Sequence, residues 1–203
     1  MAVEEAPWRT PLSRVPLTWV RALVGCLGAG LLVGIIVAGL GSRLAMRLVA
    51  AANPDADGTL TENGNVVGEI TLEGTLDLVL FTGIPVGLLA GLVVFCVRRW
   101  LPAAMPWRGL ALTLPLLALF GPGIFDSESS DFRLLEPAEL SVAVFGVLFP
   151  LAGLALAPLA DELGPGVPSS FYRRDVTLIA GVAIAVLTGV GLLFVGLEVA
   201  DIL

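Results

Sequence analysis

The chain has 203 residues, of which 57% are hydrophobic and 14% charged, and its formal net charge is −7. This length corresponds to one domain, and a mean hydropathy of +0.95 is typical of membrane proteins rather than of soluble globular ones. The acidic balance argues against nucleic-acid binding, and the lack of His removes the commonest general base and metal ligand. We therefore expect no catalytic residue, no metal and no cofactor.

Apolar segments long enough for a membrane span dominate the chain, since ~20 residues cross a hydrocarbon core of ~30 Å. Residues 1–17 are polar and contain three prolines, which predicts a short cytoplasmic segment before a single transmembrane domain over residues 18–203. Its first helix should continue past the membrane until Asn53-Pro54 stops it. The predicted spans are residues 18–40, 75–97, 109–125, 138–160 and 176–197.

The fold class predicted from these segments is an all-α membrane protein, a five-span helix bundle. The third span is short and interrupted by Pro115 and Gly121-Pro122-Gly123, so it either crosses the membrane or re-enters it, and we favour crossing. Residues 58–74, between spans 1 and 2, alternate apolar and polar residues around the turn dipeptide Asn63-Gly64. We interpret them as a small extracytoplasmic β-hairpin.

The arginines indicate the orientation, because basic residues are retained on the cytoplasmic side. Five spans place eight of the 11 arginines on the side of the N-terminus, together with all four tryptophans, and 13 of the 18 carboxylates on the other side. This predicts a cytoplasmic N-terminus and an extracytoplasmic C-terminus. All basic residues are Arg, which we attribute to codon use in a GC-rich genome, so we expect a prokaryotic plasma (inner) membrane.

Small residues recur at every fourth position in three of the spans, which places them on one helix face each and predicts close, zipper-like helix crossings. The rows either pack within the chain, which we favour, or one of them forms a homo-oligomer interface. The glycines of these rows are Gly30, Gly34, Gly83, Gly87, Gly91, Gly181 and Gly189.

Arg43 and Arg47 are the main candidates for a functional site, because they share a helix face on the otherwise acidic outer side. The sharper hypothesis is an anion site for a lipid phosphate or an anionic substrate. The alternative, which we favour, is that they pair with Glu62, Glu69, Glu73 or the acidic loop and dock the hairpin on the helix, and Asp77 is a further partner for them. Asp77 is itself a candidate, because an ionisable residue within a span is often functional.

The acidic loops are weaker candidates for a calcium site. Asp126, Glu128 and Asp131 do not follow the twelve-residue EF-hand spacing, and in the run that starts at Asn53 position twelve is Gly64 rather than Glu. Solvated loops are the preferred interpretation.

Three function classes remain open, in decreasing order of preference. The first is a non-enzymatic accessory or scaffold subunit with an acidic extracytoplasmic cap, whose partners are the lipid bilayer and a protein partner or second copy. The second is a small homo-oligomeric transporter or channel packed through the glycine rows. The third is a membrane-embedded enzyme that uses outer-face carboxylates.

Overall fold

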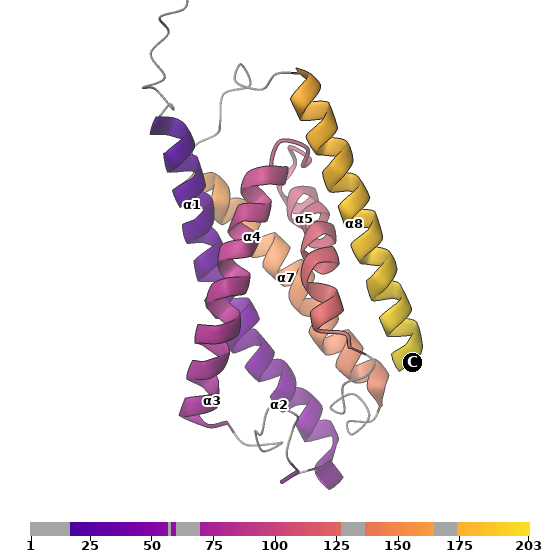
Figure 1. Cartoon of the computed structure of the whole chain (residues 1–203). Coiled ribbons are helices and arrows are strands. Elements are labelled where there is room, and N and C mark those ends of the chain that lie inside the picture. Colours follow the sequence, from indigo (N-terminus) through magenta and orange to yellow (C-terminus); the bar gives the residue numbers. More distant parts are fainter. Residues whose placement is uncertain (1–16, 57, 60–69, 127–136, 165–173) are drawn as a thin grey trace, which may run out of the picture.

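The computed structural model of the chain describes residues 17–56, 58–59, 70–126, 137–164 and 174–203, and these form a bundle of helices (Figure 1). The prediction of an all-α fold is confirmed, because the described residues contain no strand. Within the described residues, four helices are long and apolar enough to cross a membrane, and they comprise Leu17–Ala52, Leu72–Val97, Ala138–Leu163 and Ala180–Ile202.

The first of these is continuous over 36 residues and contains α1 (Leu17–Val33), the π-helical segment η1 (Gly34–Gly41) and α2 (Ser42–Ala52). At 1.5 Å per residue it is about 54 Å long, well beyond the ~30 Å of a hydrocarbon core. It ends at Ala52. The next residue, Asn53, has non-helical backbone angles and donates a side-chain hydrogen bond to the Val49 carbonyl at 2.9 Å. A short 3₁₀ turn, η2 (Pro54–Ala56), follows.

The second long helix contains α3 (Leu72–Asp77), the π-helical segment η3 (Leu78–Gly83) and α4 (Ile84–Val97). Pro85 explains why the wide turns lie just before α4. It has no N–H to donate to the Phe81 carbonyl, and its ring needs extra room at that turn. The two π-helical segments pack against each other where the two long helices cross.

The predicted hairpin at 58–74 is wrong at its C-terminal end, because Leu72, Glu73 and Gly74 already belong to α3. Thr71 is the N-cap of this helix, and its hydroxyl accepts a hydrogen bond from the Gly74 N–H at 3.1 Å. A capped first turn satisfies a backbone donor that a strand would need a partner strand to satisfy. Residues 60–69, the rest of the predicted hairpin, lie outside the described residues.

The five-span count is not supported in full. The segment predicted as span 3 forms α5 (Met105–Phe120), which has only 16 residues, followed by the 3₁₀ turn η4 (Gly121–Gly123). At 1.5 Å per residue α5 is about 24 Å long, shorter than a typical span. It is therefore not among the four helices that qualify by length and composition.

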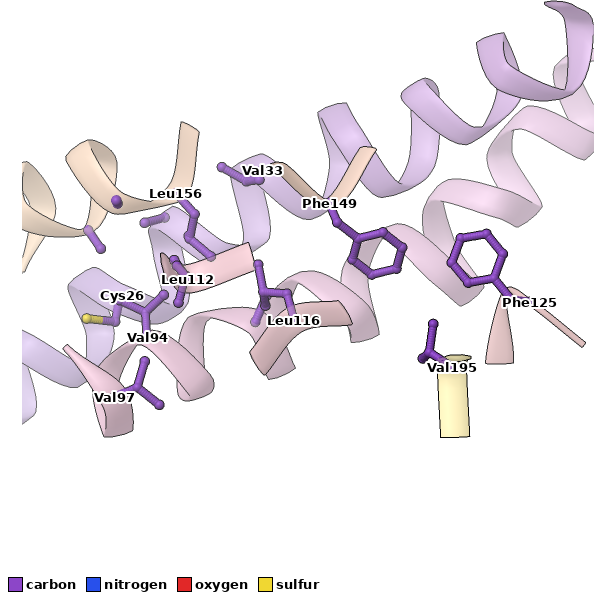
Figure 2. Packing of buried hydrophobic residues seen from close by; sticks show 14 residues of the cluster. Cys26, Val33, Val94, Val97, Leu112, Leu116, Phe125, Phe149, Leu156 and Val195 are labelled. Carbon is purple, nitrogen blue, oxygen red and sulfur yellow. The ribbon is translucent and has the colours of Figure 1, made fainter. Parts of the chain in front are cut away.

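The last two helices are α7 (Ala138–Leu163) and α8 (Arg174–Ile202). In α7, Pro150 and Pro158 lie inside a continuous helix, and α8 packs along α5 at the outside of the bundle (Figure 1). The core between the helices is apolar, with Leu112 and Leu156 fully buried and Phe125 beside Phe149 at a ring distance of 6.2 Å (Figure 2).

The bundle has two distinct ends. One consists of the start of α1, the ends of α4 and α7 and the starts of α5 and α8, and we call it the Arg98 end. The other, which we call the Asn53 end, contains the end of α2, the start of α3 and the end of α8 (Figure 1).

Candidate functional site

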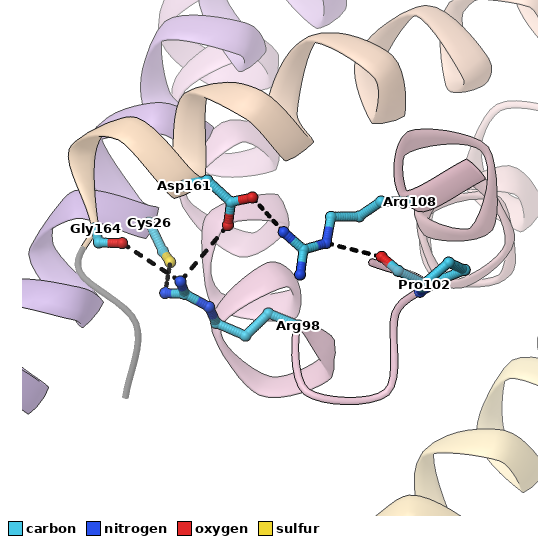
Figure 3. A network of polar contacts seen from close by, with 6 residues as sticks. All are labelled: Cys26, Arg98, Pro102, Arg108, Asp161 and Gly164. Carbon is cyan, nitrogen blue, oxygen red and sulfur yellow. Dashed lines mark hydrogen bonds and ion pairs between the residues drawn. The ribbon is translucent and has the colours of Figure 1, made fainter. Parts of the chain in front are cut away.

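Arg98 organises a polar cluster at the Arg98 end (Figure 3). It is the C-cap residue of α4, and its guanidinium reaches both α1 and α7. Nη1 donates to the Cys26 sulfur at 3.7 Å, and Nη2 donates to the Gly164 carbonyl at 3.3 Å. Nη2 also lies 3.6 Å from Oδ1 of Asp161. One side chain therefore connects three helices.

The backbones of α1 and α7 meet directly beneath this guanidinium. A Cβ atom on Gly25 would lie 2.5 Å from the Gly164 nitrogen, and one on Gly164 would lie 3.0 Å from the Ala22 carbonyl oxygen. The Gly164 carbonyl follows the last turn of α7, where carbonyls have no partner within the helix. Arg98 supplies that donor and places a positive charge at the negative end of the helix dipole.

Arg108 approaches the same carboxylate from α5. Its Nη1 pairs with Oδ2 of Asp161, and its Nε donates to the Pro102 carbonyl at 3.1 Å. Asp161 therefore lies between two guanidiniums. The side chains of Arg98, Arg108 and Asp161 are 14%, 22% and 32% exposed, so this is a partly desolvated network with one more positive than negative charge.

Sequence reasoning missed this cluster. Arg98, Arg108 and Asp161 entered the prediction only as charges that set the orientation. A signal existed, because the predicted topology placed an acidic pair, Asp161-Glu162, at a span end on the side that holds most arginines. Opposite charges at neighbouring span ends favour pairing in a partly desolvated setting.

The site predicted around Arg43 and Arg47 lies at the other end of the bundle. Both arginines are on α2, with Arg43 half-buried and Arg47 exposed, and both interact with other residues. Glu73 and Asp77 lie exposed on α3, and neither takes part in an ion pair within the described part of the chain. Glu69 lies outside the described residues. Docking of a cap by these arginines therefore stays a prediction.

The glycines of spans 1 and 2 face one another across the helix crossing. A Cβ on Gly30 would lie 2.6 Å from the Gly91 nitrogen, and one on Gly87 would lie 2.9 Å from the Gly34 Cα. Gly83 also belongs to this contact, because its Cβ would lie 3.1 Å from the Gly34 carbonyl oxygen. At these positions the two backbones touch, which leaves no room for a side chain.

The small residues predicted as a row in span 5 do not form an equivalent contact. Gly181 lies beside Trp100, whose Nε1 would be 2.9 Å from a Cβ there, whereas Gly189 has no atom within 4 Å of its Cβ position. Gly191 instead lies on the face of α8 that packs against α5, because a Cβ atom there would lie 2.7 Å from the Ala118 Cβ. An unpredicted crossing joins α5 and α7, where Gly153 lies close to Thr113 and Gly109.

The polar contacts at the Arg98 end are ion pairs and hydrogen bonds of Arg98 and Arg108. Among the described residues, no three His, Cys, Asp or Glu side chains are grouped so that they could hold a metal ion. The cysteines are free, Cys26 buried within the bundle and Cys96 exposed on α4. Comparison of the chain with protein-family models, curated proteins and solved structures yields no match.

Proposed function

We propose that the chain is a five-span integral protein of a prokaryotic plasma membrane that serves as a non-enzymatic accessory or scaffold subunit. Four spans follow from length and composition. The fifth is α5, which starts at the Arg98 end and runs through the bundle beside α7 and α8 (Figure 1). A short helix continued by η4 can cross if the local bilayer thins or the ends are polar.

The orientation we propose places the Arg98 end in the cytoplasm and the Asn53 end outside. Arg21, Arg98, Arg99 and Arg108 all lie at the Arg98 end, as expected for a cytoplasmic surface. Trp107, which is 65% exposed, lies there at the start of α5, where an amphipathic ring suits the membrane interface. In this arrangement the C-terminus is extracytoplasmic.

The observation that carries the scaffold proposal is the outer position of α8. Only 6% of the residues in its most apolar 18-residue stretch are buried, against 28–39% in the other three long helices. Gly191 of α8 packs on Ala118 of α5 and Val195 packs on Gly121 of η4, whereas large side chains such as Val182, Leu187 and Leu193 on α8 are exposed. A helix attached by one side leaves a lateral face for a partner helix.

The homo-oligomeric transporter or channel is the second candidate, and the glycine contacts reduce its support. The glycines of spans 1 and 2 face each other inside one chain, so they are not free to line an interface between chains. Among the described members of the predicted rows, Ala185 and Gly189 of α8 are exposed, and these two remain for that role. An enzyme that uses outer carboxylates would depend on exposed residues such as Glu73 and Asp77.

Site-specific photo-crosslinking in native membranes tests the scaffold proposal. A photoreactive residue at Leu187, 70% exposed on α8, should give one discrete adduct with a different protein, whereas one at Phe81, 78% exposed on η3, should give none. An adduct with twice the mass of the 21.0 kDa chain would favour the homo-oligomer instead. If only lipid is labelled, and equally at the two positions, the result contradicts the scaffold proposal and the homo-oligomer alike.

A further inference from the structure

Two of the three guanidinium nitrogens of Arg108 have partners within the described residues. Nη1 pairs with Asp161 and Nε donates to the Pro102 carbonyl, but Nη2 has no hydrogen-bond partner in the part of the chain that the structure describes. In Figure 3 this third nitrogen points away from both Asp161 and Pro102. Asp161 and Pro102 hold the guanidinium plane in place, so the two N–H groups of Nη2 have a fixed direction.

The charges around Arg108 favour an anion at this position. Arg98 and Arg108 share one carboxylate, which leaves one positive charge in excess. The excess stays at one when the adjacent exposed residues Arg99 and Glu162 are included. Because the Arg108 side chain is only 22% exposed, an anion here is attracted more strongly than at a fully hydrated site.

The depth of the site indicates the class of anion. Arg108 lies in the first turn of α5, directly after the exposed Trp107, and α5 enters the apolar bundle beyond it. Tryptophan at a span end marks the headgroup region, and an arginine fork is suited to phosphate. The cytoplasmic leaflet is also the one that is rich in anionic lipid.

We propose that Nη2 of Arg108 binds the phosphate of an anionic phospholipid at the cytoplasmic leaflet, with Asp161 and Pro102 fixing the orientation of the guanidinium. The inference rests on the proposed membrane placement but not on the scaffold role. Arg108 is thus both a structural ion-pair partner and a lipid ligand, and the two roles use different nitrogens of one side chain.

Native mass spectrometry of the full chain, with phosphatidylglycerol and phosphatidylcholine added to detergent-solubilised protein, tests this proposal. Arg108→Gln should weaken phosphatidylglycerol binding by about tenfold, the effect of one charge-assisted hydrogen bond. It should weaken phosphatidylcholine binding less, because the choline cation offsets the charge of that lipid's phosphate. Arg21→Gln removes the same charge from an exposed position at the same end and should change binding by less than about twofold. Arg108→Lys keeps the charge but not the planar guanidinium, so its affinity for phosphatidylglycerol should lie between those of the wild type and Arg108→Gln.

A second variant separates lipid binding from folding, because Arg108→Gln also removes a partner of Asp161. Asp161→Asn lowers the negative charge beside the site, so it should increase the affinity for phosphatidylglycerol even if it lowers the melting temperature. The proposal is overturned if both variants melt earlier while the preference for phosphatidylglycerol stays at the wild-type value. Full competition by millimolar inorganic phosphate or glycerol phosphate would also overturn it, since the ligand would then be a free phosphate.

Discussion

Gly30 and Gly87 touch through their backbones where α1 crosses α4: a Cβ atom on Gly87 would lie 2.5 Å from the carbonyl oxygen of Gly30. The contact continues on both sides, from Gly91 beside Leu27 to Gly83 beside Gly34. In lipid, where apolar side chains gain nothing by leaving the solvent, close backbone contact of this kind supplies packing energy. The crossing therefore fixes the position of the helix Leu72–Val97 relative to the helix Leu17–Ala52.

Gly87→Leu should destabilise the protein, because its new side chain would collide with the α1 backbone rather than with a flexible side chain. We expect a loss of about 1–3 kcal/mol, the usual effect of overpacking, with a lower melting temperature in detergent and a broadened size-exclusion peak. Gly189→Leu is the matched control, because nothing lies within 4 Å of the Cβ position there. Equal melting temperatures for the two variants would show that the crossing is not as close as described.

Arg98→Ala should also destabilise the protein, because it leaves the Gly164 carbonyl and Asp161 without this donor. We expect a loss of about 1.5–3 kcal/mol, the contribution of hydrogen bonds to a charged group. Arg21→Ala, at an exposed position on α1, should change stability by less than about 0.5 kcal/mol.

A double-mutant cycle of Arg98→Ala with Asp161→Asn isolates the ion pair, and we expect a coupling energy of about 0.5–2 kcal/mol in thermal or denaturant unfolding. Additive effects would mean that Arg98 acts through Gly164 and Cys26 alone.

Arg47→Ala tests the cap predicted at the Asn53 end. If Arg47 helps to hold residues 58–74 against α2, limited proteolysis should cleave this segment several-fold faster in the variant, because local opening then requires less free energy. Arg21→Ala serves as the control for a lost arginine at the other end of the bundle. Identical cleavage rates in wild type and in Arg47→Ala would refute the docking role of this residue.

Local sequence signals predicted most of the helices, but they did not predict which face of each helix contacts its neighbour. Asn53-Pro54 predicted the end of the first helix, which the structure places at Ala52. In span 5 the spacing of small residues favoured Gly181 and Gly189, whereas the contact with α5 uses Gly191. Helix rotation depends on the neighbour, and one helix alone does not specify it.

The two other differences also have physical causes. Alternating residues suggested a strand through Leu72, but the Thr71 cap starts a helix there, and capping is as local a signal as alternation. The Arg98–Asp161 pair joins residues far apart in the sequence, so it depends on how α4 and α7 are arranged. Their charges were visible in the sequence, but their proximity was not.

Cysteine accessibility in intact cells tests the five-span arrangement most directly. In a Cys96→Ala background, single cysteines are placed at exposed Asp55, Ala103 and Leu203 and treated with a membrane-impermeant thiol reagent, while Cys26 stays buried. We predict labelling at Asp55 and Leu203 and protection at Ala103 until the cells are permeabilised. Labelling at Asp55 with protection at both Leu203 and Ala103 would contradict the account, because α5 would then not cross the membrane.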